Sequence, residues 1–371
     1  MGWFVRAADG AKGLNVTTAY INRIATSVPP FDVHEPFVGF AASLLPNNAH
    51  AALFQRLAKK TGIEHRYSFL GPATGQGAAL DRDEFYIRGT FPSTAARMRY
   101  FEAHAPILAA EAIERLELGR DRNRITHIII TSCTGFSAPG LDLELIERSN
   151  LPATAERTLI GFMGCYAAIN AFKLAHHIVR SEPTAHVLTL NLELCTLHLQ
   201  ETRQIEKILS FLLWGDGCAA SLITAEPSGL AIEGFRALLV PESRELITWQ
   251  VGDSGFDMYL SGQVPATIQT ALRSGVGDIL GNKPINSIDL WAVHPGGRTV
   301  VDAVERAFDL APEALWISRE ILRLFGNMSS ATVVFVLAEL LRSAQPNAAG
   351  LAISFGPGLV AETMRFRSGR H

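Results

Sequence analysis

Short apolar runs that alternate with helical segments constrain the fold of this chain more than any other feature. The stretch 125–131 consists of isoleucine and threonine interrupted only by His127, which is typical of a strand buried on both faces. Further strands are expected at 186–192, 218–224, 288–293 and 351–355. Helices are expected at 46–60, 165–180, 298–308 and 330–342. Because buried strands that alternate with helices stack into layers, the sequence predicts a layered α/β fold.

The order of these elements is similar in two parts of the chain. A polar segment with proline and glycine, 225–230, separates them, so we expect an N-terminal half at residues 1–228 and a C-terminal half at residues 229–371. The length of 371 residues also favours two parts over one small domain. An irregular loop is expected at 71–95, where Gly, Pro, Asp and Thr are frequent.

Charge and composition exclude several classes of function. Only 19% of the residues are charged, the net charge is −3 and the pI is about 6.4, which gives no electrostatic case for nucleic-acid binding. The apolar stretch 331–341 contains Glu339 and is too short to span a bilayer. The first 13 residues carry Arg6 and Lys12 and lack the apolar core of a signal peptide. We therefore expect a cytoplasmic protein without integral membrane association.

The cysteines argue against a metal site and against a disulfide-stapled fold. Four are present, no two of them at the CxxC spacing of a zinc site, and four are too few to staple so long a chain. They are Cys133, Cys165, Cys195 and Cys218. Reduced thiols in a cytoplasmic protein are the simpler interpretation.

Cys165 is the candidate nucleophile. It follows Gly164 and begins the expected helix 165–180, where unpaired backbone N–H groups and the positive end of the helix dipole favour the thiolate. Such a thiolate can take an acyl group from a thioester and form a covalent acyl-enzyme. Taken alone, Cys165 could equally be a small buried apolar residue. A core position is the favoured interpretation for Cys195 and Cys218, whereas Cys133 could line a pocket.

A histidine and an asparagine complete the candidate site. His294 stands at the carboxyl end of the expected strand 288–293 and is followed by Pro295-Gly296-Gly297, a place where ligands gather in α/β folds. Asn327 precedes the helix 330–342, so it could simply cap that helix. Beside a thiolate, however, an imidazole and an amide could stabilise a thioester enolate. Decarboxylation of a malonyl thioester would then supply the carbanion without an acidic base.

Several motifs in this order resemble the type III polyketide synthases, the chalcone synthase-like family, and fit a bacterial-type member. They are Gly164-Cys165, Trp214-Gly215-Asp216-Gly217, His294-Pro295-Gly296-Gly297, Gly326-Asn327-Met328-Ser329-Ser330 and Gly356-Pro357-Gly358. The resemblance runs from about residue 15 to the C-terminus. It implies a homodimer with a thiolase-like fold, in which two pseudo-duplicated halves form αβαβα layers.

The resemblance also implies a reaction. A starter acyl-CoA would load Cys165, malonyl-CoA would extend it by decarboxylative condensation, and His294 and Asn327 would hold the thioester carbonyl. His294 would also keep Cys165 as a thiolate through an ion pair. The chain would then cyclise to a pyrone, a resorcinol or a chalcone-like product. No cofactor and no metal are implied, because the coenzyme A thioesters are substrates.

The family's pocket residues can be carried over position by position. The two residues that guard the passage from the coenzyme A tunnel resemble Trp214 and Met258. The expected cavity wall consists of Cys133, Cys195, His198, Gly356, Pro357 and, through a loop that reaches a partner subunit, Ala138. Arg56 and Lys60 match a basic helix that grips the coenzyme A phosphates, although Leu53 replaces its third basic residue, and a solvated helix face is the alternative. The methionine at 258 and the small Ala138 favour a flexible aliphatic chain, hence an alkylpyrone or alkylresorcinol, with an aromatic starter still open.

Two other functions remain as alternatives. A ketoacyl-acyl-carrier-protein synthase III of fatty-acid initiation also uses Cys, His and Asn, but its histidine is usually followed by Gln-Ala-Asn rather than Pro295-Gly296-Gly297. Hydroxymethylglutaryl-CoA synthases need a glutamate base that has no convincing equivalent here. The second alternative is a catalytically dead protein of this fold that serves as a ligand-binding or scaffold subunit. The intact set of Cys165, His294 and Asn327 argues against it.

Overall fold

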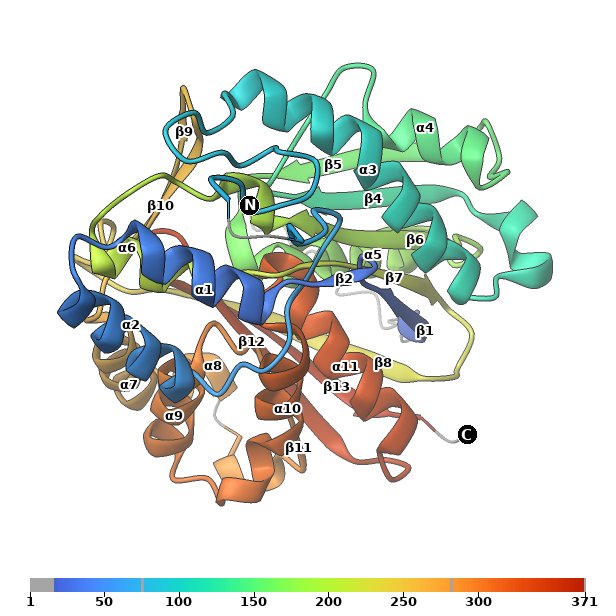
Figure 1. Ribbon diagram of the computed structural model, residues 1–371. Coiled ribbons are helices and arrows are strands. Elements are labelled where there is room, and N and C mark those ends of the chain that lie inside the picture. Colours follow the sequence, from blue (N-terminus) through green and yellow to red (C-terminus); the bar gives the residue numbers. More distant parts are fainter. Residues whose placement is uncertain (1–16, 75–76, 281–282, 370–371) are drawn as a thin grey trace, which may run out of the picture.

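One mixed sheet runs through the protein, whose computed structural model describes residues 17–74, 77–280 and 283–369 (Figure 1). Within these residues the sheet has nine strands in the order β11-β12-β13-β8-β1-β7-β6-β4-β5, and two small antiparallel pairs, β9-β10 and β2-β3, lie outside it. The strands are β1 (Tyr20–Ser27), β2 (Phe31–Asp32), β3 (Tyr67–Ser68), β4 (His127–Ser132), β5 (Glu156–Gly161), β6 (Val187–Leu194), β7 (Asp216–Thr224), β8 (Leu230–Leu239), β9 (Ile247–Gly252), β10 (Gly255–Leu260), β11 (Leu290–Val293), β12 (Ala349–Gly356) and β13 (Val360–Ser368).

Helices occupy most of the chain between these strands. They are α1 (His34–Leu44), α2 (Asn48–Lys60), α3 (Thr94–Arg115), α4 (Leu141–Arg148), α5 (Ala167–Ser181), α6 (Ile205–Phe211), α7 (Val264–Ser274), α8 (Val276–Leu280), α9 (Arg298–Phe308), α10 (Trp316–Phe325) and α11 (Thr332–Ser343). Three short 3-10 turns matter for the site, namely Gly164–Tyr166, Cys195–His198 and Ser329–Ala331.

The large sheet consists of two parts that meet weakly. Strands β5, β4, β6, β7 and β1 lie on one side of the junction, and β8, β13, β12 and β11 lie on the other. The junction between β1 and β8 has only two residue pairs, Tyr20↔Ala231 and Ile21↔Leu230. Within each part, neighbouring strands pair along longer stretches than at this junction. The large sheet can therefore be described as two half-sheets.

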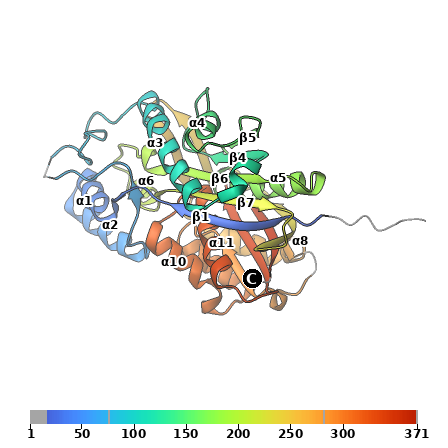
Figure 2. The same cartoon turned by 90° about the vertical axis from the view of Figure 1, so that its right-hand side faces the viewer.

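Alternating side chains divide the core into an outer and a central layer. Along β4, Ile128 and Ile130 pack into the cluster that includes α3, whereas Ile129 packs with α5 and α11. This alternation is the period-2 geometry of a strand covered on both faces. Figure 2 shows α3 on one side of β1, β6 and β7 and α11 on the other.

The second half-sheet follows the same rule. Trp291 of β11 packs outward against Phe308 of α9, with ring centroids 5.3 Å apart, whereas Ala292 faces the central layer. Helices α5 and α11 each contact strands of both half-sheets and therefore lie between them. The order helix, sheet, helix, sheet, helix is the layered αβαβα arrangement that the sequence predicts.

Most expected elements are present within a few residues of their predicted bounds. The clearest difference concerns Cys165, and β5 is a strand for which the sequence analysis has no counterpart. Helix α5 begins at Ala167, so Cys165 lies in the 3-10 turn before it rather than in its first turn. Strand β5 pairs only with β4 and leaves most of its residues exposed, because it forms an edge of the large sheet.

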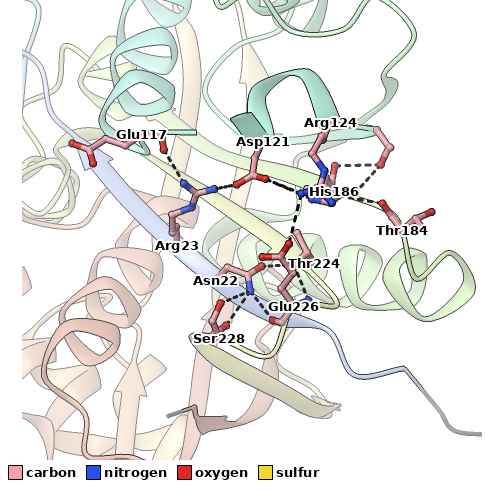
Figure 3. A network of polar contacts seen from close by, with 11 residues as sticks. Asn22, Arg23, Glu117, Asp121, Arg124, Thr184, His186, Thr224, Glu226 and Ser228 are labelled. Carbon is pink, nitrogen blue, oxygen red and sulfur yellow. Dashed lines mark hydrogen bonds and ion pairs between the residues drawn. The ribbon is translucent and has the colours of Figure 1, made fainter. Parts of the chain in front are cut away.

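A polar network fastens β1 to the turns beside it (Figure 3). Asp121 accepts hydrogen bonds from Arg23 of β1 and from Arg124, the latter at 3.2 Å. His186 lies beside the same carboxylate, with 3.8 Å between Nε2 and Oδ1. Further along β1, the Asn22 amide donates to the carbonyl oxygens of Glu226 and Ser228 at 2.9 and 3.0 Å. These contacts join β1, which lies at the junction of the half-sheets, to the turn that contains Asp121 and to the turn that contains Glu226 and Ser228.

No helix among residues 17–74, 77–280 and 283–369 is both long and apolar enough to cross a bilayer. The N-terminal segment on which the signal-peptide expectation rests lies outside the described residues.

Candidate active site

An apolar cavity lies where the ends of β4, β11 and β12 meet the turn that precedes α5. The wall of this central cavity includes Cys165, His294 and Asn327. All three are buried, with 8%, 1% and 2% of their surfaces exposed. Three elements far apart in the sequence therefore bring a thiol, an imidazole and an amide to one enclosed space, as the sequence predicts.

The turn that carries Cys165 depends on two unusual backbone positions. Phe162 and Gly164 both have positive φ, 55° and 74°. A Cβ at Gly164 would lie 2.3 Å from Pro357, so any side chain there would collide with the 356–358 turn. The Gly164 N–H donates to Cys133 Sγ at 3.0 Å. These contacts hold the Cys165 thiol at the cavity wall.

His294 follows β11 and is fixed through its backbone. Its N–H donates to the Ile353 carbonyl at 2.8 Å, and its own carbonyl accepts from Gly296 at 3.0 Å. Neither ring nitrogen has a hydrogen-bond partner among the described residues, although both are buried. Buried polar atoms without partners are uncommon and point to a group that a substrate satisfies.

Asn327 is held between two loops. Its backbone pairs with the segment around Trp214, donating to Leu213 at 2.7 Å and accepting from Gly215 at 3.0 Å. Its side-chain Oδ1 accepts from the Ser329 N–H at 2.9 Å, and Nδ2 donates to the Gly296 carbonyl at 3.3 Å. The side-chain amide therefore fixes the turn before α11. Its Nδ2 makes one long hydrogen bond and lies beside the loop that follows His294.

Burial dominates the ionisation of the thiol and the imidazole. It raises the pKa of Cys165 to about 12, although hydrogen bonds from Ser329 and Asn327 act in the opposite direction. Burial also lowers the pKa of His294 to about 3. Desolvation therefore acts against the expected thiolate–imidazolium pair and favours the neutral form of both groups.

Sequence reasoning missed a buried carboxylate next to this cavity. Glu193, in β6, accepts hydrogen bonds from the Cys133 N–H at 2.9 Å, from Thr134 Oγ1 at 3.0 Å and from Ser330 Oγ at 2.6 Å. Burial raises its pKa to about 7. It joins the loop of Cys133 to the loop of Asn327 and so fixes two parts of the cavity wall. A glutamate inside a strand in which every second residue is leucine was the available signal.

Most of the expected pocket residues line the central cavity. They are Trp214, Met258, Cys133, Cys195, Gly356 and Pro357. All four cysteines are buried free thiols, and Cys218 is a core residue, as predicted. Phe162, Trp249 and Ser329 also line the cavity and were not anticipated.

One expected wall residue lies elsewhere. His198 is buried behind the wall, where its Nε2 lies 2.7 Å from the Thr134 carbonyl and its Nδ1 accepts from Phe256. Its ring stacks on Phe256 at 4.2 Å, so it supports the wall instead of forming it. Ala138, which is expected to reach the cavity of a partner subunit, lines a surface depression of its own chain with Phe101 and Leu143.

A wide cleft adjoins the central cavity on the side of α2, α7 and α9. This outer cleft contains about 1690 Å³ and shares Leu260, Val264, Gly296 and Val300 with the central cavity. Lys60 lines it, as expected of a coenzyme A site, whereas the exposed Arg56 does not. Arg298 and Arg306 of α9 line it as well and were not identified from the sequence. Three basic side chains thus surround the approach to Cys165.

Comparison with known families identifies the class of this protein. Its residues 32–227 match the N-terminal domain of the chalcone and stilbene synthases, and residues 232–369 match their C-terminal domain. The chain therefore belongs to the chalcone and stilbene synthase family. It is a type III polyketide synthase, an acyltransferase with a thiolase-like fold, and its family uses coenzyme A thioesters as substrates and no separate cofactor.

Individual relatives agree with this assignment along nearly the whole chain. The alpha-pyrone synthesis polyketide synthase-like Pks18 of Mycobacterium tuberculosis is 29% identical over 365 residues, covering 94% of this chain and 91% of that protein. Bisdemethoxycurcumin synthase of Oryza sativa subsp. japonica is 30% identical over 395 residues, covering 99% and 96%.

Solved structures give the same result. PKS-I from the brown alga Ectocarpus siliculosus superposes with a TM-score of 0.86 at 28% identity, covering 96% of this chain and all of that one. The 1,3,6,8-tetrahydroxynaphthalene synthase of Streptomyces coelicolor A3(2) superposes with a TM-score of 0.83 at 26% identity, covering 95% and 100%. The type III polyketide synthase expectation is confirmed over the fatty-acid initiation alternative.

Proposed function

We propose that Cys165, His294 and Asn327 carry out the acyl transfer and condensation of this polyketide synthase, and that the product is a pyrone. In the loading step Cys165 Sγ attacks the thioester carbonyl of a starter acyl-CoA, and His294 accepts the thiol proton. The carbon–sulfur bond to coenzyme A breaks, and the departing thiolate takes the proton from His294. The neutral state of both residues suits this transfer, because no charge is buried before the substrate arrives.

The extension step uses the same donors. Malonyl-CoA loses its carboxylate as carbon dioxide, and the electron pair of the broken bond forms a thioester enolate. Asn327 Nδ2 and the N–H of His294 donate to the enolate oxygen. The enolate carbon then attacks the acyl carbonyl on Cys165, the acyl–sulfur bond breaks, and Cys165 leaves as a thiolate that takes a proton from solvent. The extended chain, now a coenzyme A thioester, is transferred back to Cys165 before each further extension. Finally an enol oxygen of the chain attacks the thioester carbonyl, the carbon–sulfur bond breaks as the lactone ring closes, and the departing thiolate takes the enol proton.

The observation that carries this proposal is the meeting of the three side chains in one buried cavity. The cavity wall is largely apolar, which suits an aliphatic starter, and the relative from Mycobacterium tuberculosis is named for alpha-pyrone synthesis. Incubation with labelled malonyl-CoA and starters from acetyl-CoA to long-chain and aromatic acyl-CoAs, followed by mass spectrometry, should yield pyrones from aliphatic starters. Resorcinols or chalcones would overturn the product assignment.

Cys165→Ala tests the role of the thiol. We expect it to abolish condensation while slow malonyl-CoA decarboxylation persists, because the enolate donors are intact. Product formation near the wild-type rate would disprove the assignment of the nucleophile. Activity only with malonyl acyl carrier protein would disprove the proposed donor.

Coenzyme A is proposed to lie in the outer cleft, with its phosphates near Lys60, Arg298 and Arg306. Ammonium and guanidinium groups are the usual partners of phosphate, and the cleft shares four residues with the central cavity. Lys60→Ala and Arg298→Ala should each raise the KM for malonyl-CoA about two- to fivefold. Thioesters of N-acetylcysteamine lack the nucleotide and should be unaffected. Lys59→Ala is the matched control on α2; an equal effect there would argue against a specific cleft.

A homodimer is proposed from the edge of the large sheet. Strand β5 is exposed along most of its length, and Leu159 on it is 52% exposed. Met163, two residues after the strand, is 37% exposed, and Phe136, whose ring centroid lies 5.8 Å from that of Phe162, is 49% exposed. An exposed edge strand beside apolar side chains is normally covered by another chain. We also propose that residues 1–228 and 229–371 are the two related halves of each subunit.

A further inference from the structure

Arg66 is a buried arginine that no step of the proposed reaction uses. Only 2% of its surface is exposed, and its Nη1 donates to the Phe211 and Trp214 carbonyls at 3.2 and 2.8 Å. It is not among the described residues that line the central cavity or the outer cleft. We propose that Arg66 is a positioning residue for Asn327 and acts on it through the segment 211–215. This inference rests on the proposed function, because it concerns the amide that donates to the enolate oxygen.

The chemistry of the two carbonyl groups explains why a buried cation is stable here. Phe211 ends α6 and Trp214 lies in the turn after it, and the last carbonyl groups of a helix have no partner within the helix. The helix dipole also favours a cation at this end. Burial lowers the pKa of Arg66 to about 10, which leaves the guanidinium charged at neutral pH. Its Nε donates to His34 Nδ1 at 3.0 Å, and its Cζ lies 4.6 Å from the centroid of the Phe37 ring, so its orientation is fixed.

The backbone of Asn327 is paired with the segment that Arg66 holds. The Asn327 N–H donates to the Leu213 carbonyl at 2.7 Å, and its carbonyl accepts from the Gly215 N–H at 3.0 Å. These two bonds form a parallel bridge between Asn327 and Trp214. The carbonyl that Arg66 binds most closely therefore belongs to the residue that lies between the two backbone partners of Asn327.

Arg66 also packs against the segment that leads into Asn327. The two residues before Arg66 donate their backbone N–H groups to the Arg323 carbonyl at 2.9 and 3.1 Å. Gly326 has a φ of 69°, and a Cβ there would lie 2.9 Å from Arg66 Cγ. The arginine thus contacts both backbone segments that determine where the Asn327 side chain begins. A change at position 66 should displace the amide without touching the substrate.

Arg66→Lys is the first test. A single ammonium group cannot replace the guanidinium fork on two carbonyl groups and a histidine, so the segment 211–215 should shift. We expect kcat for malonyl-CoA decarboxylation, measured as acetyl-CoA formed without a starter, to fall roughly 10- to 100-fold, the loss that a displacement of about 1 Å can cause. KM for malonyl-CoA should be unchanged. Acylation of Cys165 by a starter, followed by mass spectrometry of the intact protein, should persist, because that step does not use the amide.

A double-mutant cycle with Asn327→Ala separates positioning from a general structural effect. If Arg66 acts through Asn327, no amide is left to displace in the Asn327→Ala background. Arg66→Lys should then change the residual decarboxylation rate by less than about twofold. Equal fold-losses in both backgrounds would mean that the two residues act independently and would overturn the inference.

Arg97→Lys is the matched control. Arg97 is also buried, donates from Nη1 to the Leu197 and Leu199 carbonyls at 2.6 and 2.9 Å and, like Arg66, has no partner for Nη2 among the described residues. The control variant therefore truncates an equally buried cation that does not contact the segment 211–215. Its melting temperature should fall as that of Arg66→Lys does, but its decarboxylation rate should stay within about twofold of the wild type. An equal loss of rate in both variants would overturn the inference.

The remaining outcomes distinguish this inference from the proposed function. If Arg66→Lys does not fold, as judged by circular dichroism, Arg66→Met replaces it in the cycle, because it leaves no charge to bury. A folded variant at position 66 that decarboxylates at the wild-type rate, while Asn327→Ala does not, would overturn the role of Arg66 alone. Wild-type decarboxylation by Asn327→Ala itself would instead overturn the role of Asn327 in the proposed function.

Discussion

At the scale of single residues, opposing effects act on the Cys165 thiol. Hydrogen bonds from Ser329 and Asn327 favour the thiolate, but burial among apolar side chains favours the thiol and prevails. The neighbouring imidazole is kept neutral by the same burial. A neutral pair becomes a catalyst only when a substrate supplies the carbonyl that the sulfur attacks. The proton then moves over a short path inside the cavity, and no ion has to be desolvated beforehand.

This state predicts the pH dependence of Cys165 alkylation. Because its pKa is raised to about 12, iodoacetamide should react slowly at pH 7. The rate should rise about tenfold per pH unit up to pH 10 without a plateau, since only the thiolate reacts. Peptide mapping identifies the alkylated cysteine, and His294→Ala should leave the slope unchanged. A plateau below pH 7 that His294→Ala abolishes would show an ion pair instead.

Asn327 offers a second prediction at this scale. Asn327→Ala should lower malonyl-CoA decarboxylation about 10²–10³-fold, the usual loss for one oxyanion donor. Asn327→Asp keeps the acceptor that binds the Ser329 N–H but removes the Nδ2 donor, so its activity should also fall, and its thermal stability should drop because the buried carboxyl faces the Gly296 carbonyl. Asn48→Ala, at an exposed position of α2, is the control. Unchanged decarboxylation with reduced stability would leave Asn327 only its role in shaping the turn.

At the scale of elements, β1 depends on the network around Asp121 (Figure 3). This carboxylate is only 16% exposed and interacts with Arg23, Arg124 and His186. Asp121→Asn should lower the free energy of unfolding by about 1–3 kcal/mol, the range for hydrogen bonds to charged groups. Urea denaturation measures this change. Glu144→Gln, which breaks an exposed pair with Arg148, should cost at most about 0.5 kcal/mol; equal effects would mean that the network is not cooperative.

The elements also show what can be read from the sequence. Cys165, His294 and Asn327 could be identified because each stands at the end of an element beside glycine, and such ends meet at one edge of layered α/β folds. His198 was placed in the cavity wall only because it matches a wall position of the resembled family. Its partners, Thr134 and Phe256, are distant in the chain, so its true position depended on tertiary contacts.

The effect of burial on the thiol pKa could not be anticipated for a related reason. Helix dipoles and neighbouring N–H groups are local and can be anticipated from the sequence, whereas the degree of desolvation depends on all the side chains around Cys165. Arg298 was missed because the first residue of an amphipathic helix gives no sign of which cleft it faces. The basic residues of α2 could be proposed only through the family resemblance, and only Lys60 of that pair reaches the outer cleft.

At the scale of the whole molecule, the unpaired edge of the large sheet predicts self-association. A free strand edge offers backbone hydrogen-bonding groups, and the apolar side chains beside β5 would be poorly solvated in a monomer. Wild-type protein should therefore behave in sedimentation as a particle of about twice the 40.3 kDa of one chain. Leu159→Lys places a charge on the proposed contact and should shift the protein toward the monomer, because an unpaired charge is costly at an interface.

Leu239→Lys is the matched control for this prediction. Leu239 is 65% exposed, but it lies on β8, within the second half-sheet and away from the β5 edge. This variant should sediment as the wild type does. If it dissociates and Leu159→Lys does not, the contact lies on the second half-sheet instead. Monomeric wild-type protein with full activity would show that the central cavity is complete within one chain, and Ala138 would then have no part in a neighbouring subunit's site.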